Sequence, residues 1–383
     1  MNWRIVKWTG LGAVALVALI FAGWIIALPP AASVAAMQPI AKEEAEAAIA
    51  ALKPPKRARP LIAIIGINDA TETTDYLMPY GILRRADVAD VVTLATKPGP
   101  MTLFPVLKIE PQATIAEFDA QHPEGADYVI VPAMSRDDDP SALQWISSQA
   151  ARGAIVIGVC VGAKVVASTG LLDGKRATTH WYSLRELQGR HPSIRYVANR
   201  RLVVDRGVAT TTGISASMPM SLILVEAIAG RDKAEAVGRD LGLADWDMRH
   251  DSNAFQFTRP FALTAMRNAM AFWNREQLGI ALVPGVDEVS LALVADAWSR
   301  TWRSRAVTFA GSAGALATRG GIRILPDQVA ASWPSERLLP AIGVSPPAMA
   351  LDQTLSAIET RYGPPTADFV AMQLEYPRHA APR

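Results

Sequence analysis

The sequence predicts an α/β fold in which helices cover both faces of a parallel β-sheet, and three observations carry this prediction. Short, wholly apolar runs recur between residues 60 and 160, for example Leu61–Ile65 and Tyr128–Val131. Helical stretches such as Asp75–Ala86 separate them. Strands buried on both faces of a parallel sheet have this composition, and helical crossovers usually join them. The third observation is Gly158-Val159-Cys160-Val161-Gly162, which joins a strand-like run directly to a helix-like run.

The expected elements follow one another in a regular order. Residues 29–59, which contain Pro29-Pro30 and Pro54-Pro55, are expected to form a spacer with one short solvated helix. Strands and helices then alternate, and ligand chemistry in such a sheet belongs at the carboxyl ends of the strands, where Cys160 lies. The expected strands are 61–65, 91–95, 128–131 and 154–157, and the expected helices are 75–86, 140–151 and 163–169.

Composition narrows the function only a little. The chain has 383 residues, of which 50% are hydrophobic, so it has room for two domains. Lys and Arg number 38 against 36 for Asp and Glu, and no basic run is longer than Lys56–Arg59. Nothing in this balance calls for a nucleic-acid partner. Cys160 is the only cysteine, which excludes an intramolecular disulfide.

The N-terminal residues predict a membrane anchor. The core Leu11–Leu28 is almost wholly apolar and is long enough to cross about 30 Å of hydrocarbon as a helix. Arg4 and Lys7 precede it, and positive charge holds a short leading segment in the cytoplasm. We therefore expect a single-pass membrane protein whose bulk is extracytoplasmic, or periplasmic in a bacterium. The alternative is a cleaved signal peptide with a small-x-small site at Ser33-Val34-Ala35.

Cys160 has the surroundings of a nucleophile elbow. A strand that turns abruptly into a helix needs small neighbours, because the nucleophile's backbone is strained and the helix packs closely, and Gly158 and Gly162 supply them. The amides at the start of the following helix would point toward the thiol and lower its pKa. The alternative is a buried cysteine that acts as a small hydrophobic residue.

Several segments resemble a known family. The run from Gly158 through Cys160 to His180-Trp181, together with Val208–Gly213, Ser221–Gly230 and Asp75–Ala86, is similar to the DJ-1/PfpI family of the class I glutamine amidotransferase-like superfamily. The closest likeness is to the amidase-like domain of AraC-type regulators, and it covers about residues 60–257. This resemblance implies a flavodoxin-like sandwich with a reactive cysteine.

The resemblance also implies a set of site residues around Cys160. The position that matches the family's acid is Asp75, with Asp69 and Glu72 as nearby alternatives. A carboxylic acid beside a thiol can donate a hydrogen bond or relay a proton. The alternative role for Asp75 is a charge that complements the helix dipole.

His180 and two backbone amides complete the implied site. His180 would act as a base to Cys160, or else it would pack against Trp181 and only shape the pocket. Oxyanion-type amides are expected at Val161 and Ala133. In the family a glycine pair is common at the second of these positions, whereas this chain has Pro132-Ala133-Met134.

A second departure from the family lies near Ser215. Relatives of the regulator type often carry an acidic residue there, whereas this chain has Met218 and Met220. The two departures together weaken the expectation of hydrolysis.

The C-terminal part contains an internal echo of the first. Val92–Ala95 matches Val307–Ala310 and Ile109–Pro111 matches Ile324–Pro326, with the same offset in residue number for both pairs. We therefore expect residues 278 to about 375 to be a partial, degenerate second copy. It has no cysteine, and at this offset the position of Asp75 falls on Ser290. The expected organisation is 1–28 anchor, 29–59 spacer, 60–235 DJ-1/PfpI-like domain, 236–277 helical connector and 278–383 partial repeat.

Three classes of function are consistent with these features, so the sequence leaves open whether the protein is an enzyme. The first is a Cys-dependent hydrolase, hydratase or lyase, amidase-like in character, acting on a small carbonyl, amide or nitrile-like substrate. The second is a non-catalytic ligand or redox sensor, and the third is a structural protein that retains only the fold. A homodimer is a further expectation.

We expect no cofactor, no metal and no DNA partner. The tail lacks a helix-turn-helix and a basic recognition helix. No second ligand stands at a useful spacing from the remaining histidines, which are His122, His191, His250 and His379.

Overall fold

The central element of the protein is a seven-stranded β-sheet. The computed structural model describes residues 16, 19–30, 37–243 and 245–378. The strand order is β11-β12-β8-β7-β1-β3-β6, and every pairing is parallel except that between β11 and β12. The predicted parallel α/β sheet is confirmed. The strands are β1 (Leu61–Gly66), β3 (Asp90–Ala95), β6 (Ala113–Thr114), β7 (Tyr128–Val131), β8 (Ile155–Gly158), β11 (Leu202–Asp205) and β12 (Val208–Thr211).

Helices cover both faces of this sheet, and β1 shows why its strands are apolar throughout. All six residues of β1 are buried. Ile62 and Ile64 belong to one hydrophobic cluster, whereas Ala63 and Ile65 point to the opposite face and belong to another. The first cluster includes α3 (Thr73–Ala86), α8 (Ser217–Ala229) and α9 (Arg231–Leu241); the second includes α4 (Ile115–Gln121), α5 (Pro140–Ala151), α6 (Gly162–Ser168) and α7 (Leu184–Arg190).

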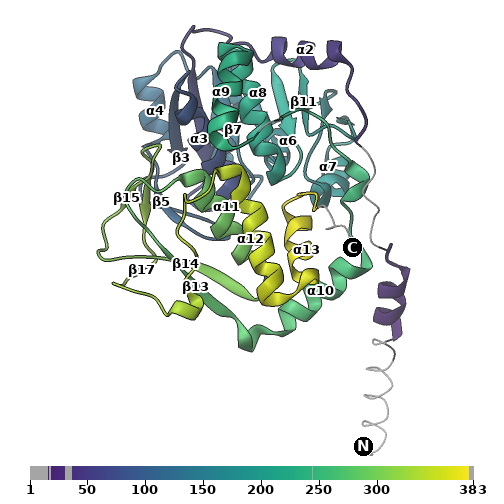
Figure 1. Ribbon diagram of the computed structural model, residues 1–383. Helices are drawn as coiled ribbons and strands as arrows, with labels where there is room; N and C mark the ends of the chain where they lie inside the picture. Colours follow the sequence, from purple (N-terminus) through teal and green to yellow (C-terminus); the bar gives the residue numbers. More distant parts are fainter. Residues whose placement is uncertain (1–15, 17–18, 31–36, 244, 379–383) are drawn as a thin grey trace, which may run out of the picture.

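The C-terminal part adds a second parallel sheet below the first in the view of Figure 1. It has the order β13-β14-β17, with β13 at Glu276–Ala281, β14 at Ser304–Ala310 and β17 at Gln328–Val329. Helix α11 (Glu288–Ser299) connects β13 to β14.

A third sheet takes strands from both parts of the chain. Its order is β15-β16-β5-β4-β2. The two halves are therefore joined by backbone hydrogen bonds between β16 and β5. The strands are β2 (Asp69–Glu72), β4 (Met101–Phe104), β5 (Lys108–Glu110), β15 (Leu316–Ala317) and β16 (Arg323–Leu325).

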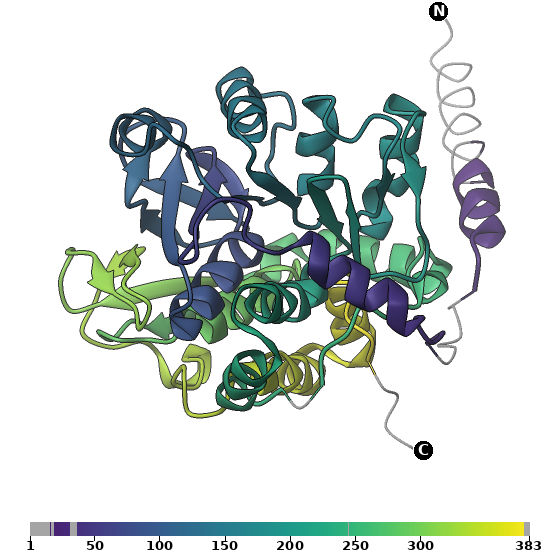
Figure 2. The same cartoon turned by 90° about the horizontal axis from the view of Figure 1, so that it is seen from above.

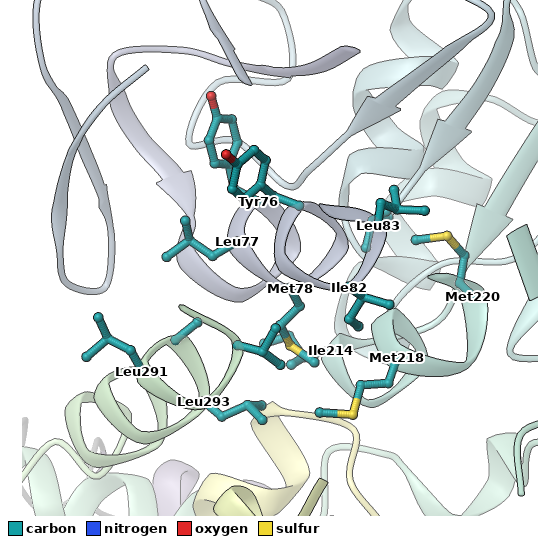
Figure 3. Packing of buried hydrophobic residues seen from close by; sticks show 14 of the residues in the cluster. Tyr76, Leu77, Met78, Ile82, Leu83, Ile214, Met218, Met220, Leu291 and Leu293 are labelled. Atoms are coloured by element: carbon teal, nitrogen blue, oxygen red, sulfur yellow. The ribbon is translucent and has the colours of Figure 1, made fainter. Parts of the chain in front are cut away.

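Helix α3 lies at the centre of the contact between the halves. Figure 3 shows side chains of α3, α8 and α11 meeting in one apolar cluster, including Leu77, Met218 and Leu291. The remaining helices are α2 (Lys42–Ala51), which lies across the first half in Figure 2, and α10 (Arg259–Met270), α12 (Pro347–Tyr362) and α13 (Pro364–Gln373), which pack in the second half. Strands β9 (Arg176–Ala177) and β10 (Arg195–Tyr196) form a short pair.

The predicted membrane anchor and its extracytoplasmic placement are contradicted. Within the described part of the chain, no helix is long and apolar enough to span a membrane. Residues 19–27 are helical, about 14 Å at 1.5 Å per residue, and the end of this helix is held against the folded body. Arg259 donates to the Ile25 carbonyl at 3.2 Å. Most of the segment 11–18, and the alternative cleavage site 33–35, lie outside the described residues.

Candidate functional site

Cys160 occupies a strained turn between β8 and α6. Its φ is +57°, in the left-handed region that residues with a side chain rarely adopt. Two threonines fix this backbone. The Cys160 amide donates to Thr211 Oγ1 at 3.0 Å, and Thr179 Oγ1 donates to the Cys160 carbonyl at 3.1 Å. Strand, strained turn and helix together form a nucleophile elbow.

The glycines of the elbow are required by close packing. A Cβ added at Gly162 would lie 2.0 Å from the Val131 carbonyl oxygen, because α6 starts against the end of β7. A Cβ at Gly158 would lie 3.0 Å from Ala163 Cα. Larger side chains at either position would push the helix away from the strands that hold Cys160.

The structure places Asp75 beneath the elbow, in the first turn of α3. Its side chain is fully buried. Oδ2 accepts a hydrogen bond from the Ala133 amide at 3.1 Å, whereas Oδ1 has no hydrogen-bond partner among the described residues. Burial, followed by the charge of Glu72, raises the pKa of Asp75 well above its usual value. Burial therefore favours the protonated form of Asp75, and Oδ1 has no hydrogen-bond partner among the described residues to compete for that proton.

The pKa of the Cys160 thiol is shifted in the direction opposite to the one expected from the sequence. Burial raises its pKa well above the usual value, and the neighbouring carboxylates add to the effect: Asp75 in its ionised form, Glu72 and Glu375. The Val161 amide opposes the shift by hydrogen bonding to the sulfur. The predicted lowering of the thiol pKa is therefore wrong, because a seven-residue helix and one amide do not offset full burial.

The two predicted oxyanion amides are not equivalent. Val161 follows the nucleophile and its amide contacts the sulfur. Ala133 lines the same cavity, but its amide already donates to Asp75. Only the Val161 amide is therefore placed to meet charge that develops at a substrate bound to Cys160.

Glu72 and Arg300 form an ion pair next to Asp75. Glu72 Oε2 accepts from the Asp75 amide at 2.6 Å and so caps α3, while its Oε1 accepts from Arg300 Nη2 at 2.7 Å. The Arg300 Nε also donates to Asp296 at 2.9 Å. Of the two alternatives to Asp75, Glu72 is thus a buried structural acid, whereas Asp69 is exposed at the start of β2.

His180 reaches the cavity with both ring nitrogens engaged. Nε2 contacts the Gln373 carbonyl at 3.0 Å, and Nδ1 accepts from the Tyr182 amide at 3.2 Å. A carbonyl only accepts, so the proton is assigned to Nε2. Burial lowers the pKa of His180, which keeps the ring neutral. These contacts favour the alternative in which His180 shapes the pocket.

Cys160 opens onto a cavity of about 550 Å³. Val161, Ala133 and His180 all line it, so the structure brings together the predicted site residues, with Asp75 one hydrogen bond behind Ala133. The rest of the lining includes residues that were not predicted. From the C-terminal part of the chain these are Phe257, Phe261, Ala265, Arg300, Trp302 and Gln373, most of them apolar.

Near Ser215, where regulator-type relatives often carry an acidic residue, this chain places the carboxylate of Glu375. Met218 and Met220 are buried core residues. Glu375 instead accepts from the Gly213 amide and contacts His250 Nε2 at 2.9 Å. No sequence motif marked Glu375, because both partners are distant from it in the chain. Within the described residues, no group of three or more His, Cys, Asp or Glu could hold a metal ion.

Part of the chain is similar to proteins of a known family. Residues 62–227 match the model of the DJ-1/PfpI family. The isonitrile hydratase of Pseudomonas putida is 32% identical over 176 residues, which cover 44% of this chain and 73% of that enzyme. The chain belongs to the DJ-1/PfpI family. The HTH-type transcriptional regulator CdhR of Pseudomonas aeruginosa is 28% identical over 125 residues, which cover 33% of this chain and 37% of the regulator.

Solved structures of the DJ-1/PfpI family cover about half of the chain. The crystal structure of Drosophila melanogaster DJ-1beta covers 49% of this chain and 100% of its own, with 20% identity and a TM-score of 0.44. The DJ-1/PfpI match ends at residue 227. Phe257, Arg300, Trp302 and Gln373, which also line the cavity, therefore lie outside the matched segment.

Proposed function

We propose that the protein is a Cys160-dependent hydratase or hydrolase that acts on a small carbonyl, amide or nitrile-like substrate. The observation that carries this proposal is a strained, buried cysteine facing an apolar cavity of about 550 Å³, beside the buried carboxyl group of Asp75, whose pKa is raised by burial. Nucleophile, proton donor and an adjacent amide are the groups that addition to a polarised carbon requires. The relative named isonitrile hydratase makes an isonitrile the first substrate to test.

The proposed reaction adds one water to the substrate. The Cys160 sulfur forms a bond to the electrophilic carbon, and the thiol proton passes by way of Asp75 to the carbon or heteroatom that gains electrons. The covalent intermediate is held beside the Val161 amide. Water then attacks the same carbon, the C–S bond breaks, and the sulfur recovers a proton. For an isonitrile the product is a formamide. For an amide the relayed proton goes to the nitrogen, the C–N bond breaks and the amine leaves, and water then releases the carboxylic acid from the sulfur.

The test is a turnover assay on a panel of small alkyl isonitriles, nitriles and amides. We expect formation of the hydrated product by the wild-type protein, and loss of at least about 100-fold in C160A. T169A serves as a control, because Thr169 ends the same helix and is absent from the cavity lining. Equal rates for C160A and the wild type would refute the proposal.

A non-catalytic ligand sensor is the second candidate. The engagement of both ring nitrogens of His180 favours it, since a free base for Cys160 is then missing on that side. A redox sensor is less well supported, because oxidation follows thiolate character and exposure, and Cys160 is 4% exposed with a raised thiol pKa. Binding of the same small molecules without turnover, measured by calorimetry, would select the sensor.

A further inference from the structure

The two halves of the chain repeat the same elements at a constant spacing. Strands β1, β4, β5 and β6 recur in order as β13, β15, β16 and β17, and helix α3 recurs as α11, all with one offset in residue number. The repeat extends to side chains. Gln112 accepts from the Thr93 amide at 2.9 Å, and Asp327 accepts from the Thr308 amide at the same distance. Apart from β2, the element order of residues 61–114 therefore recurs in residues 276–329.

The halves face each other about a pseudo-twofold axis. Strands β5 and β16 are equivalent, and they pair with each other in antiparallel register, with Ile109 opposite its own counterpart Ile324. Equivalent helices α3 and α11 also pack together. Contact between equivalent surfaces is the signature of an isologous interface, the kind that joins two identical subunits.

A reciprocal pair of ion pairs crosses this axis. Arg300, just after α11, binds Glu72, which caps α3. Its counterpart Arg85, in the last turn of α3, binds Asp287, which caps α11. The offset that relates the strands also relates Arg85 to Arg300 and Glu72 to Asp287. Each half thus sends one arginine to the helix cap of the other.

The two ion pairs have different surroundings. Behind Glu72 stand Asp75, Cys160 and the cavity that Arg300 lines. Behind Asp287 the position of Asp75 is Ser290, whose amide and hydroxyl bind Asp287. Each arginine also has a second carboxylate partner, but from a different place. Arg300 binds Asp296 of its own helix, at the position equivalent to Gly81, whereas Arg85 binds Asp240 of α9.

We propose that residues 276–329 occupy the place of a second subunit, and that Arg300 is the positioning residue this half delivers to the Cys160 site. The role at Cys160 rests on the proposed function. The guanidinium holds Glu72, and Glu72 holds the amide of Asp75, so the acid is fixed against the elbow by a residue from the other half. The same cation adds positive charge beside the sulfur.

The test compares R300Q with R85Q, the pseudosymmetric control. Both arginines are buried and both cross the interface, so a purely structural role predicts equal effects. The readout is the rate of Cys160 alkylation by iodoacetamide across pH, which needs no substrate turnover and so separates this proposal from the proposed function. The other charged or titratable groups around the thiol are Asp75, Glu72, Glu375 and His180, and they are unchanged in both variants.

We expect R300Q to move the alkylation profile to higher pH by about one unit, about tenfold slower at a given pH, while R85Q keeps the wild-type profile. R300K, which retains the charge, should restore most of the rate and replaces R300Q if that variant does not fold. Equal profiles for folded R300Q and the wild type, or equal shifts in R300Q and R85Q, would overturn the role of Arg300.

The subunit-replacement part is tested by sedimentation velocity and hydrogen exchange on the full chain. We expect no self-association through residues 101–110 and 316–325, because these strands already pair within one chain. A monomer, or a dimer that protects other surfaces, agrees with the proposal. A dimer whose formation adds protection at these strands would overturn it.

Discussion

At the scale of residues, two buried acids on either side of one arginine define the chemistry of the site. Asp75 and Asp296 both have raised pKa values because burial disfavours the charged carboxylate. Arg300 lies between their helices and binds Glu72. The site thus combines two carboxyl groups whose protonated form is favoured by burial with a buried thiol, a combination that suits proton transfer to a neutral substrate better than storage of a thiolate.

Replacing Asp75 by Asn should lower turnover by about 10²-fold or more, because an amide cannot transfer a proton. The fold should survive, since an Asn side chain can still accept from the Ala133 amide. The measurement is kcat with the best substrate of the panel. D69N is the matched control, because Asp69 is exposed and should be silent. Unchanged kcat in D75N would show that Asp75 carries no proton.

Asp296 should make stability depend on pH. Its pKa is raised to about 7 in the folded protein from an ordinary value of 3.8. The folded state therefore binds this proton more tightly, and the resulting stability is complete below about pH 4 and is lost as the pH rises through about 7. Urea unfolding at a series of pH values should show the free energy of unfolding falling over this range.

In D296N the fall should be smaller, because an amide does not titrate. It should not vanish, since Asp75 has a pKa raised in the same direction. A D296N variant that loses stability with pH as steeply as the wild type would contradict the prediction.

At the scale of elements, the sequence predicts what is local and repetitive. The apolar runs placed β1, β3, β7 and β8 to within about one residue, because strands buried on both faces admit few polar residues. The elbow was also predictable, because the small residues that its sharp turn requires, Gly158 and Gly162, lie within two residues of Cys160 in the sequence. The membrane anchor, which was predicted from an apolar run and the positive charges before it, is contradicted, because no helix in the described part of the chain is long and apolar enough to span a membrane.

The close approach of α6 to β7 makes a sharp prediction at Gly162. G162A should destabilise the protein by about 3 kcal/mol or more, because the added Cβ would meet the Val131 carbonyl at 2.0 Å. G189A, within α7, has nothing within 4 Å of its added Cβ and should be neutral or slightly stabilising. Urea unfolding of both variants measures the difference. Equal stability would show that α6 moves aside without cost.

At the scale of the whole molecule, half of the site could be predicted and half could not. Cys160, Val161 and Ala133 gather because they follow β8 and β7, neighbouring parallel strands whose carboxyl ends meet. The lining residues between 257 and 373 depend on packing between distant segments that no local pattern records. One residue of this part could have been singled out from the sequence. The constant offset between the two copies relates Arg300 to Arg85.

Glu375 ties the end of the chain to the site and should be costly to remove. E375A should destabilise the protein by about 3–5 kcal/mol, because it leaves the Gly213 amide and His250 buried without their partner. D368A is the control, since Asp368 forms an exposed ion pair with Arg378 worth about 0–1 kcal/mol. The measurement is the urea midpoint of each variant. Similar midpoints would show that the tail docks without energetic consequence.

The separate origin of the residues that line the cavity bears on how this protein can evolve. The nucleophile and its acid belong to the segment that matches the family, whereas Phe257, Phe261 and Trp302 lie beyond it. Under the proposed function, mutations in the second group would alter which molecules enter the cavity while Cys160 and Asp75 stay in place. Selection could then change substrate preference separately from the reacting groups.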